Sequence, residues 1–411
     1  MRRDSARPCP ICDATSVELL RSMRFLLPDD HPLAKTYDVV RCLECGSVHA
    51  DTPSTQADYD RYYADLSKYS DATTGTGGGE QQWDRDRLRQ TAIDIAGALG
   101  DTRRRIVDIG CGNGGLLAEL AALGYAELHG VDPSPACAET VGRIPGVTGH
   151  AGTIFQVPEA VRGADCAILS HVLEHVRDVP TALRTLRHVV RDGGTVYVEV
   201  PDASRYTDYL VAPFQDFNVE HINHFSAVSL ANALRAAGFE VEHVERKTIN
   251  ASSTAKYPAV WAIARAAQRG PMTAVRDTAL GGAVNDYISA SSRLLAEQSE
   301  HLERELASVP EIVIWGAGQT TLTLLANAPL GGAKVLAIAD SNPRYHGRTL
   351  GGFPVISPEQ LRRFQVPIVI GSLISQAPIL RRIRELGLPN RTITLEPPNE
   401  SPAEPANTRT H

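Results

Sequence analysis

The stretch from Arg105 to Leu120 constrains this chain more than any other part of it. Ile106 to Ile109 reads as a short buried strand, Leu116 to Leu123 reads as the helix that follows, and glycines dominate the turn between them. Such a turn lets the backbone approach a ligand at a helix N-terminus. We therefore expect a strand–turn–helix unit that binds a ligand at the turn. The alternative is a structural turn without a nucleotide.

The charges around the turn indicate which ligand it takes. Gly110, Gly112 and Gly115 fit a pattern that also serves dinucleotides, but Asp108 stands two residues before the first glycine. A carboxylate there would repel a pyrophosphate and attract a sulfonium ligand with a free amino group. Asp132 ends the next apolar strand and is placed to accept hydrogen bonds from ribose hydroxyls.

Class I methyltransferases bind S-adenosylmethionine (SAM) at a site that these residues closely resemble: Asp108-x-Gly110-x-Gly112-x-Gly114, followed by Val131-Asp132-Pro133-Ser134. The resemblance implies an α/β fold with a doubly wound sheet, and SAM as the methyl donor. The cofactor-binding residues expected on this basis are Asp108, Gly110, Gly112, Asn113, Gly114, Asp132, Pro133, Ser170 and Tyr69.

Strands and helices alternate from residue 105 to 200, as a doubly wound sheet requires. The strand Asp165 to Leu169 delivers Ser170 and His171 to its carboxyl end, where ligands bind in open α/β sheets. His171 is therefore a candidate pocket residue. His175, four positions later, is open to a second interpretation as a packing residue on a helix face.

Aromatic residues and glycines precede this core. Tyr59, Tyr62, Tyr63 and Tyr69 form a cluster, and residues 75–79 read Gly-Thr-Gly-Gly-Gly. The two features fit a lid that covers the cofactor and hinges at the glycines. They fit equally well with ordinary packing followed by a flexible loop.

Composition bounds the remaining possibilities. A chain of 411 residues is longer than a single hydrophobic core usually supports, so two or three domains are expected. The net charge of −7 argues against a nucleic-acid partner, and no apolar run is long enough to span a bilayer. The N-terminus also lacks the apolar region of a signal peptide, so we expect a cytoplasmic protein with reduced cysteines.

Two C-x2-C pairs predict a metal site: Cys9 with Cys12, and Cys42 with Cys45. Each pair directs two thiolates at one centre, and together they complete a tetrahedron. A closed four-thiolate site has no open position, so we expect structural rather than catalytic zinc. Four free or disulfide-paired cysteines are the alternative.

The segment from Asp216 to Ser226 is the second informative stretch, with histidines, carboxylates and amides beside an apolar helix. A histidine next to a glutamate provides a base that is tunable near neutral pH. We expect His221 to be the base and Glu220 to orient it, with His171 and His224 as reserve candidates. A purely structural role for the segment remains the alternative.

Four features together resemble the C-methyltransferases that act on nucleotide-linked keto-deoxysugars: a four-cysteine module, a class I core, a Glu-His segment and a second α/β domain. The resemblance implies that Glu220 and His221 deprotonate the carbon beside a ketone, and Phe225 and Ser226 also match. Asn218 departs from the family, which has tyrosine there. The family's Gly-Gly-Ser-Leu-Arg stretch is also missing near 249–256.

The rest of the chain divides by composition. We expect a zinc-binding module at 1–65, the methyltransferase domain at 66–250, a helical linker at 251–308, a Rossmann-like domain at 309–397 and a disordered tail at 398–411. In the Rossmann-like domain, Thr321 stands where the dinucleotide-binding pattern G-x-G-x-x-G has its final glycine, and this disfavours an NAD site. In the resembled family this domain helps hold the nucleotide of the substrate. The positions expected to do so here are Gly316, Gly318, Asp340 and Ser372.

Other functions remain open at this point. An N- or O-methyltransferase of a small metabolite fits the same core. An NAD(P)-dependent sugar oxidoreductase and a non-catalytic zinc and SAM scaffold are alternatives from other classes. The expected partner is a small-molecule acceptor, a nucleotide-linked sugar by the resemblance, and the protein is expected to be a monomer or a homodimer.

Overall fold

The computed structural model describes residues 1–28, 31–65, 77–267, 273–327, 330 and 332–396. Tyr69 and Gly75, two residues of the expected lid, and the tail from 398 therefore lie outside the described residues. The chain divides into two compact units. The first contains 1–25, 29–210 and 214–290, and the second contains 26–28, 211–213 and 291–411.

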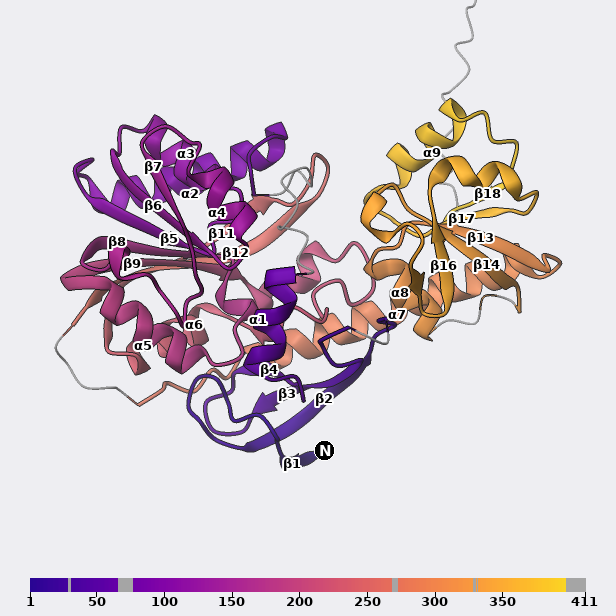
Figure 1. Ribbon diagram of the computed structural model, residues 1–411. Helices are drawn as coiled ribbons and strands as arrows, with labels where there is room; N and C mark the ends of the chain where they lie inside the picture. Colours follow the sequence, from indigo (N-terminus) through magenta and orange to yellow (C-terminus); the bar gives the residue numbers. More distant parts are fainter. Residues whose placement is uncertain (29–30, 66–76, 268–272, 328–329, 331, 397–411) are drawn as a thin grey trace, which may run out of the picture. The chain divides into compact units, whose positions relative to one another are not determined.

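A seven-stranded sheet forms the centre of the first unit (Figure 1). In chain order its strands are β5 (Arg105–Ile109), β6 (Glu127–Asp132), β7 (Val147–Ala151), β8 (Ala164–Ser170), β9 (Val190–Pro201), β11 (Phe239–Asn250) and β12 (Lys256–Ala266). Their spatial order is β11-β12-β9-β8-β5-β6-β7. The five strands from β7 to β9 are parallel, whereas β12 runs antiparallel to both β9 and β11. The order reverses at β5, since β6 lies on one side of it and β8 on the other.

Helices cover both faces of this sheet (Figure 1). They are α2 (Gln82–Leu99), α3 (Gly115–Ala122) and α4 (Pro135–Val141) on one face, and α5 (Val179–Val189) and α6 (Ala227–Ala236) on the other. Side chains of β5 point alternately to the two faces of the sheet, and a hydrophobic core forms on each face. Ile106 packs with α2 and α3 on one face, whereas Val107 and Ile109 pack with α5 and α6 on the other. The doubly wound α/β sheet expected from the sequence is thereby confirmed.

A second sheet in the same unit lies beside the two cysteine pairs, and Cys42 is the last residue of one of its strands. Its strands are β1 (Arg2–Asp4), β2 (Ser16–Arg24), β3 (Thr36–Cys42) and β4 (Val48–Asp51), and a distant strand, β10 (Asn223–His224), completes it. β10 pairs with β4 in antiparallel register, Asn223 opposite His49 and His224 opposite Val48. Helix α1 (Gln56–Asp65) follows β4. The segment expected to contain the base is therefore fixed to the cysteine sheet through β10.

The second unit has its own mostly parallel sheet, ordered β15-β16-β14-β13-β17-β18. The strands are β13 (Glu311–Trp315), β14 (Lys334–Ala339), β15 (Thr349–Leu350), β16 (Phe353–Ile356), β17 (Ile368–Ile370) and β18 (Thr392–Ile393). Helix α9 (Gln376–Glu385) packs on one face, and α8 (Gln319–Asn327) and the end of α7 (Leu280–Leu306) pack on the other. This arrangement is the Rossmann-like half expected from the sequence.

The expectation of helix throughout 251–308 is wrong for its first part. Lys256–Ala266 forms β12, paired on both sides and buried along most of its length. A strand buried on both faces loses the alternation of apolar and polar residues, so its alanines resemble a buried helix. The later part of this range is helical as expected, since α7 extends from Leu280 to Leu306. Across the described residues, no helix has both the length and the apolar character needed to cross a bilayer.

Candidate active site

A cavity of about 180 Å³ opens at the carboxyl ends of β5, β6 and β8. Ligands of open α/β sheets bind at such a reversal of strand order. Of the residues expected to bind cofactor, Asn113 and Gly114 belong to the adjoining turn but not to the lining of this cavity. The expected cofactor residues that do line it are Asp108, Gly110, Gly112, Asp132, Pro133 and Ser170, and the candidate pocket residue His171 lines it as well.

The turn between β5 and α3 depends on left-handed backbone at its glycines. Gly110 and Gly114 have φ of 78° and 79°. A Cβ on Gly110 would lie 2.7 Å from Cγ2 of Val172, and one on Gly114 would lie 2.7 Å from Cδ1 of Ile144. Side chains at either position would be strained and crowded, and at Gly110 the glycine also keeps bare backbone against the cavity.

Asp132 is held at the end of β6 by two backbone groups. Its carboxylate accepts hydrogen bonds from the amides of Gly112 and Ser134, both at 2.9 Å. Burial nevertheless raises the pKa of Asp132. These bonds hold the carboxylate against the glycine turn on the cavity wall, and its contact with a ribose stays a prediction.

Asp108 differs because no described residue donates a hydrogen bond to its carboxylate. Its exposed fraction is 3%, and it faces the cavity at the end of β5. Burial, together with the negative charge of Asp132, raises the pKa of Asp108 to about 7. A buried carboxylate without a partner is costly, so this position favours a ligand that brings a positive charge.

The raised pKa predicts pH-dependent cofactor binding. In the free protein Asp108 is protonated below about pH 7, and an ammonium group on the ligand would bind the ionised form. The carboxyl must lose its proton on binding, so the Kd for S-adenosylhomocysteine should rise by up to about tenfold per pH unit below pH 7 and level off above it. Calorimetric titration from pH 5 to 8 measures this. A flat profile would contradict the assignment of Asp108.

The opposite wall of the cavity comes from residues outside the glycine turn. Gln56, Asp60 and Tyr63 of α1 line it, together with His175. His175 lies in the short 3-10 helix η3 (Leu173–His175), so it is a cavity residue rather than the packing residue of a helix face. Of the tyrosine cluster, Tyr63 alone lines the cavity among the described residues, and the lid interpretation stays a prediction.

The Glu-His segment adjoins this wall. The Glu220 carboxylate accepts hydrogen bonds from the hydroxyls of Tyr62 at 2.8 Å and Tyr63 at 3.5 Å. The His221 ring packs edge to face on His175, with 4.8 Å between ring centroids. The side-chain oxygen of Asn218 accepts hydrogen bonds from the backbone amides of both Glu220 and His221. Asn218, the departure from the resembled family, thus orders the turn that carries the pair.

His171 is fixed between two buried carboxylates. Its Nδ1 lies 3.2 Å from Oε1 of Glu174, its Nε2 lies 3.1 Å from Oε1 of Glu199, and its φ is 56°. Burial alone would lower the pKa of His171, but these hydrogen bonds outweigh it and raise the pKa to about 9. With both nitrogens donating to carboxylates, His171 has no lone pair in this geometry for a substrate proton.

Glu199 is a functional-site residue that the sequence analysis missed. It is fully buried, and besides His171 it contacts Nζ of Lys247 and the hydroxyl of Tyr197, both at 2.5 Å. The available signal was its position as the one carboxylate in the apolar strand Val196–Val200. Nothing in the sequence indicated that the distant Lys247 would pair with it.

His224, the other reserve candidate, lies in an aromatic core. Its exposed fraction is 1%, and it packs edge to face on Phe217 and Tyr206 at 4.9 and 6.0 Å. Burial and the nearby charge of Arg7 lower the pKa of His224 to about 3. It does not belong to the described cavity lining, so the structure does not bring it together with the other candidates.

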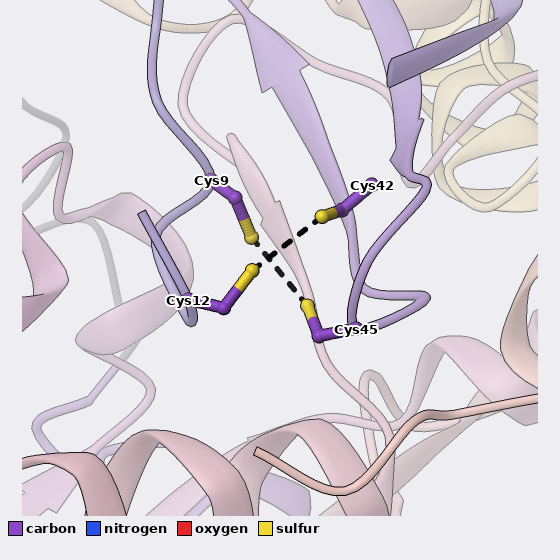
Figure 2. Close-up of side chains that lie close together, drawn as sticks. All are labelled: Cys9, Cys12, Cys42 and Cys45. Carbon is purple, nitrogen blue, oxygen red and sulfur yellow. Dashed lines mark hydrogen bonds between the residues drawn. The ribbon is translucent and has the colours of Figure 1, made fainter. Parts of the chain in front are cut away.

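The four cysteines of the two pairs converge on one point (Figure 2). Sγ of Cys9 lies 3.6 Å from that of Cys45, Sγ of Cys12 lies 3.5 Å from that of Cys42, and all four sulfurs lie within 4.8 Å of one another. Sulfurs around a tetrahedral zinc with bonds of about 2.3 Å are ~3.8 Å apart. All seven cysteines of the chain are free thiols. The geometry therefore fits a four-thiolate metal site and not a pair of disulfides.

We expect the Cys42→Ser variant to lose one equivalent of metal and several kcal/mol of unfolding free energy, because metal binding to such a site contributes directly to folding. Elemental analysis and chemical denaturation measure the two effects. Cys166→Ala, in the sheet core, is the matched control and should keep its metal. Equal metal content in the two variants would contradict the site.

Arg7 links the cysteine sheet to the cavity wall and was not singled out in the sequence. Its guanidinium has an exposed fraction of 1% and donates to the carbonyls of Arg177 at 2.7 Å and Ile222 at 3.1 Å. It also donates to the side-chain oxygen of Asn223 in β10 at 2.7 Å. Burial lowers the pKa of Arg7 to about 10. Two residues before the first cysteine, one buried cation thus fixes the segment that carries His221.

The expected nucleotide residues of the second unit form a similar turn. The Asp340 carboxylate accepts hydrogen bonds from the amides of Ala317 and Asn342, both at 2.7 Å. This repeats the pattern of Asp132 in the first unit. Thr321, in place of the third glycine, donates its hydroxyl to the carbonyl of Gly316 at 2.6 Å. Gly318 lies in the turn after β13, and Ser372 follows β17, so the expected positions stay predictions for ligand binding.

Comparisons with known proteins match the part of the chain that forms most of this cavity. Residues 81–244 match the protein family described as "Methyltransferase domain". A ubiquinone biosynthesis O-methyltransferase of Rhizobium rhizogenes is 41% identical over 99 residues, which are 23% of this chain and 40% of that protein. A protein of the same description from Methylobacterium is 39% identical over 99 residues, covering 22% and 39%. The chain thus spans about two fifths of these relatives.

Among solved structures, a Burkholderia thailandensis 1,6-didemethyltoxoflavin-N1-methyltransferase has a TM-score of 0.40 and 19% identity, covering 56% of this chain and 99% of that one. Taken with the strand order and the cavity, the family match identifies a class I SAM-dependent methyltransferase domain in this chain.

Proposed function

We propose that the protein transfers the methyl group of SAM to a carbon atom beside a ketone in a small acceptor, with a nucleotide-linked keto-sugar as the substrate class. The observation that carries the proposal is the place of His221. It packs on His175, which lines the cavity that also contains Asp108 and Asp132. A candidate base thus lies next to the candidate cofactor site.

The chain's own residues suit the cofactor. Asp108 offers a carboxylate to the amino group, Asp132 faces the ribose, and Gly110 and Gly112 keep the backbone close. When bound, SAM supplies a sulfonium-activated methyl group for in-line displacement. The protein contributes alignment of the two reactants, worth up to ~7–11 kcal/mol of barrier for a well-oriented pair.

A carbon acceptor also needs a base, because an unactivated C–H bond is not a nucleophile. His221 takes that proton in the proposed mechanism, and the gain from a positioned base is about 10²–10⁴-fold. Tyr62 and Tyr63 hold the Glu220 carboxylate, and the Glu220 carbonyl accepts a hydrogen bond from Nδ1 of His175 at 3.1 Å. Glu220 therefore orients the ring on which His221 packs. His171 is a positioning residue rather than a base, because its nitrogens are engaged.

The remaining expectations belong to this proposal. Zinc is the proposed occupant of the four cysteines, in a structural role. Gly316, Gly318, Asp340 and Ser372 are the proposed contacts for the nucleotide of the acceptor. The domain limits predicted from the sequence are retained, except that the methyltransferase sheet extends to Ala266 in β12.

An O-methyltransferase of a small metabolite is the second candidate, favoured by the 41% identity to a ubiquinone biosynthesis O-methyltransferase over part of the core. Incubation with methyl-labelled SAM and separate panels of nucleotide-linked keto-sugars and phenols distinguishes the two. Product NMR should show the label on carbon beside a ketone. Label found only in O-methyl groups of phenols would overturn the proposal in favour of the second candidate.

A further inference from the structure

We propose that Glu174, His175 and His221 form a second metal site, separate from the four cysteines, for one borderline divalent ion such as Zn²⁺ or Co²⁺. One ligand atom from each of these side chains lies within 4.8 Å of the others. Two imidazoles and one carboxylate form a donor set that such ions favour. The site itself does not depend on the proposed function.

The first argument is electrostatic. Nδ1 of His175 must donate to the carbonyl of Glu220, because a carbonyl oxygen can only accept. In the neutral ring, Nε2 then carries a lone pair, and it faces Oε1 of Glu174 at 3.8 Å. Nε2 and Oε1 can both bind a cation that lies between them. The distance is too long for a hydrogen bond and shorter than roughly 4.2 Å, twice a metal–ligand bond of about 2.1 Å.

The second argument is an unsatisfied buried atom. Glu174 has an exposed fraction of 1%, and its Oε2 has no hydrogen-bond partner among the described residues. Leaving such an oxygen buried and unpaired carries a large desolvation cost. Coordination of a cation by Glu174 removes that cost.

The third argument is the way the ligands are held. Metal-bound histidines usually donate their other N–H to a carbonyl or carboxylate, as His175 does to Glu220. The Glu174 carboxylate is oriented in turn by a hydrogen bond from Nδ1 of His171 at 3.2 Å. Ligand atoms around a tetrahedral ion with bonds of about 2.1 Å are ~3.4 Å apart, so the separations within the group, at most 4.8 Å, have to close by up to about 1.4 Å.

The ion and the proposed base exclude each other, and this consequence does rest on the proposed function. A metal bound to His221 occupies a lone pair that proton abstraction needs. An ion at this site would therefore inhibit methyl transfer to carbon, with half-inhibition at the Kd of the ion.

The test is a Co²⁺ titration of the purified holoprotein with its cysteine-bound metal in place, followed by calorimetry and visible absorption. We expect one further equivalent, with a spectrum that lacks sulfur-to-metal charge transfer. Glu174→Gln and His221→Asn should each weaken binding of that equivalent at least tenfold, with thermal denaturation confirming that both variants fold. His129 and His150 form another histidine pair, with 3.2 Å between Nδ1 and Nε2, so His150→Ala is the matched control.

The outcomes separate the claims. No further equivalent, or one that is lost in His150→Ala and retained in Glu174→Gln, would overturn the second metal site. If the ion binds as expected but stimulates turnover, the metal site stands and the assignment of His221 as the base fails.

Discussion

Replacing His221 with asparagine is expected to lower kcat by about 10²–10⁴-fold, because the acceptor loses the base that removes its proton. Binding of S-adenosylhomocysteine should be unchanged, since His221 packs on His175 and is not among the described residues that line the cofactor cavity. Turnover of the keto-sugar that proves active and calorimetric cofactor binding measure the two quantities.

The matched control is His188→Asn on the exposed side of α5, which should leave both quantities intact. Normal turnover by His221→Asn, with cofactor binding preserved, would eliminate His221 as the base. An O-methyltransferase with an acidic phenol as acceptor would tolerate the substitution far better, so the same variant also distinguishes the two candidate functions.

Replacing Asp108 with asparagine is expected to weaken S-adenosylhomocysteine binding by about 2–5 kcal/mol, at least roughly 30-fold in Kd, because a buried charge pair loses one partner. The same variant should raise the Tm of the free protein. The pKa of Asp108 in the folded state is about 7, above the value of about 3.9 for an unfolded chain, so its contribution to stability declines as the pH rises between these values. Asparagine mimics the protonated form and avoids that loss.

Thermal denaturation at pH 8, with and without S-adenosylhomocysteine, measures both effects. Asp132→Asn is the matched control, and it should change the stability of the free protein in the opposite direction. Its carboxylate accepts two backbone hydrogen bonds, so the free Asp132→Asn protein should become less stable. An Asp108→Asn protein that binds cofactor normally, or that is destabilised when free, would refute the electrostatic interpretation of the turn.

Local patterns accounted for the parts of the fold that short segments determine. The β5 turn was predictable because its glycines and Asp108 lie within a few residues of one another, and the cysteine pairs because ligand spacing reflects metal geometry. β12 was misread because burial on both faces removes its alternation. Lys256–Ala266 could be recognised as a strand only through its pairing with β9 and β11, which are separate in sequence.

The candidate site was predictable only in part for the same reason. Asp108 and Asp132 lie at the carboxyl ends of β5 and β6, His171 follows β8, and these strand ends meet at one edge of the sheet. His175 was ambiguous because the turn of η3, which aims it at the cavity, has no clear signature. Arg7 acts on carbonyls about 170 and 215 positions away in the chain, so no local pattern could indicate its role.

The pairing of β10 with β4 has a consequence for engineering this protein. A chimera that combined the methyltransferase core with another N-terminal sheet would exchange the partner strand of Asn223 and His224, and with it the setting of His221 two residues earlier. Acceptor preference should therefore be inherited from the donor of the N-terminal region at least as much as from the donor of the core. A minimal catalytic fragment would need both.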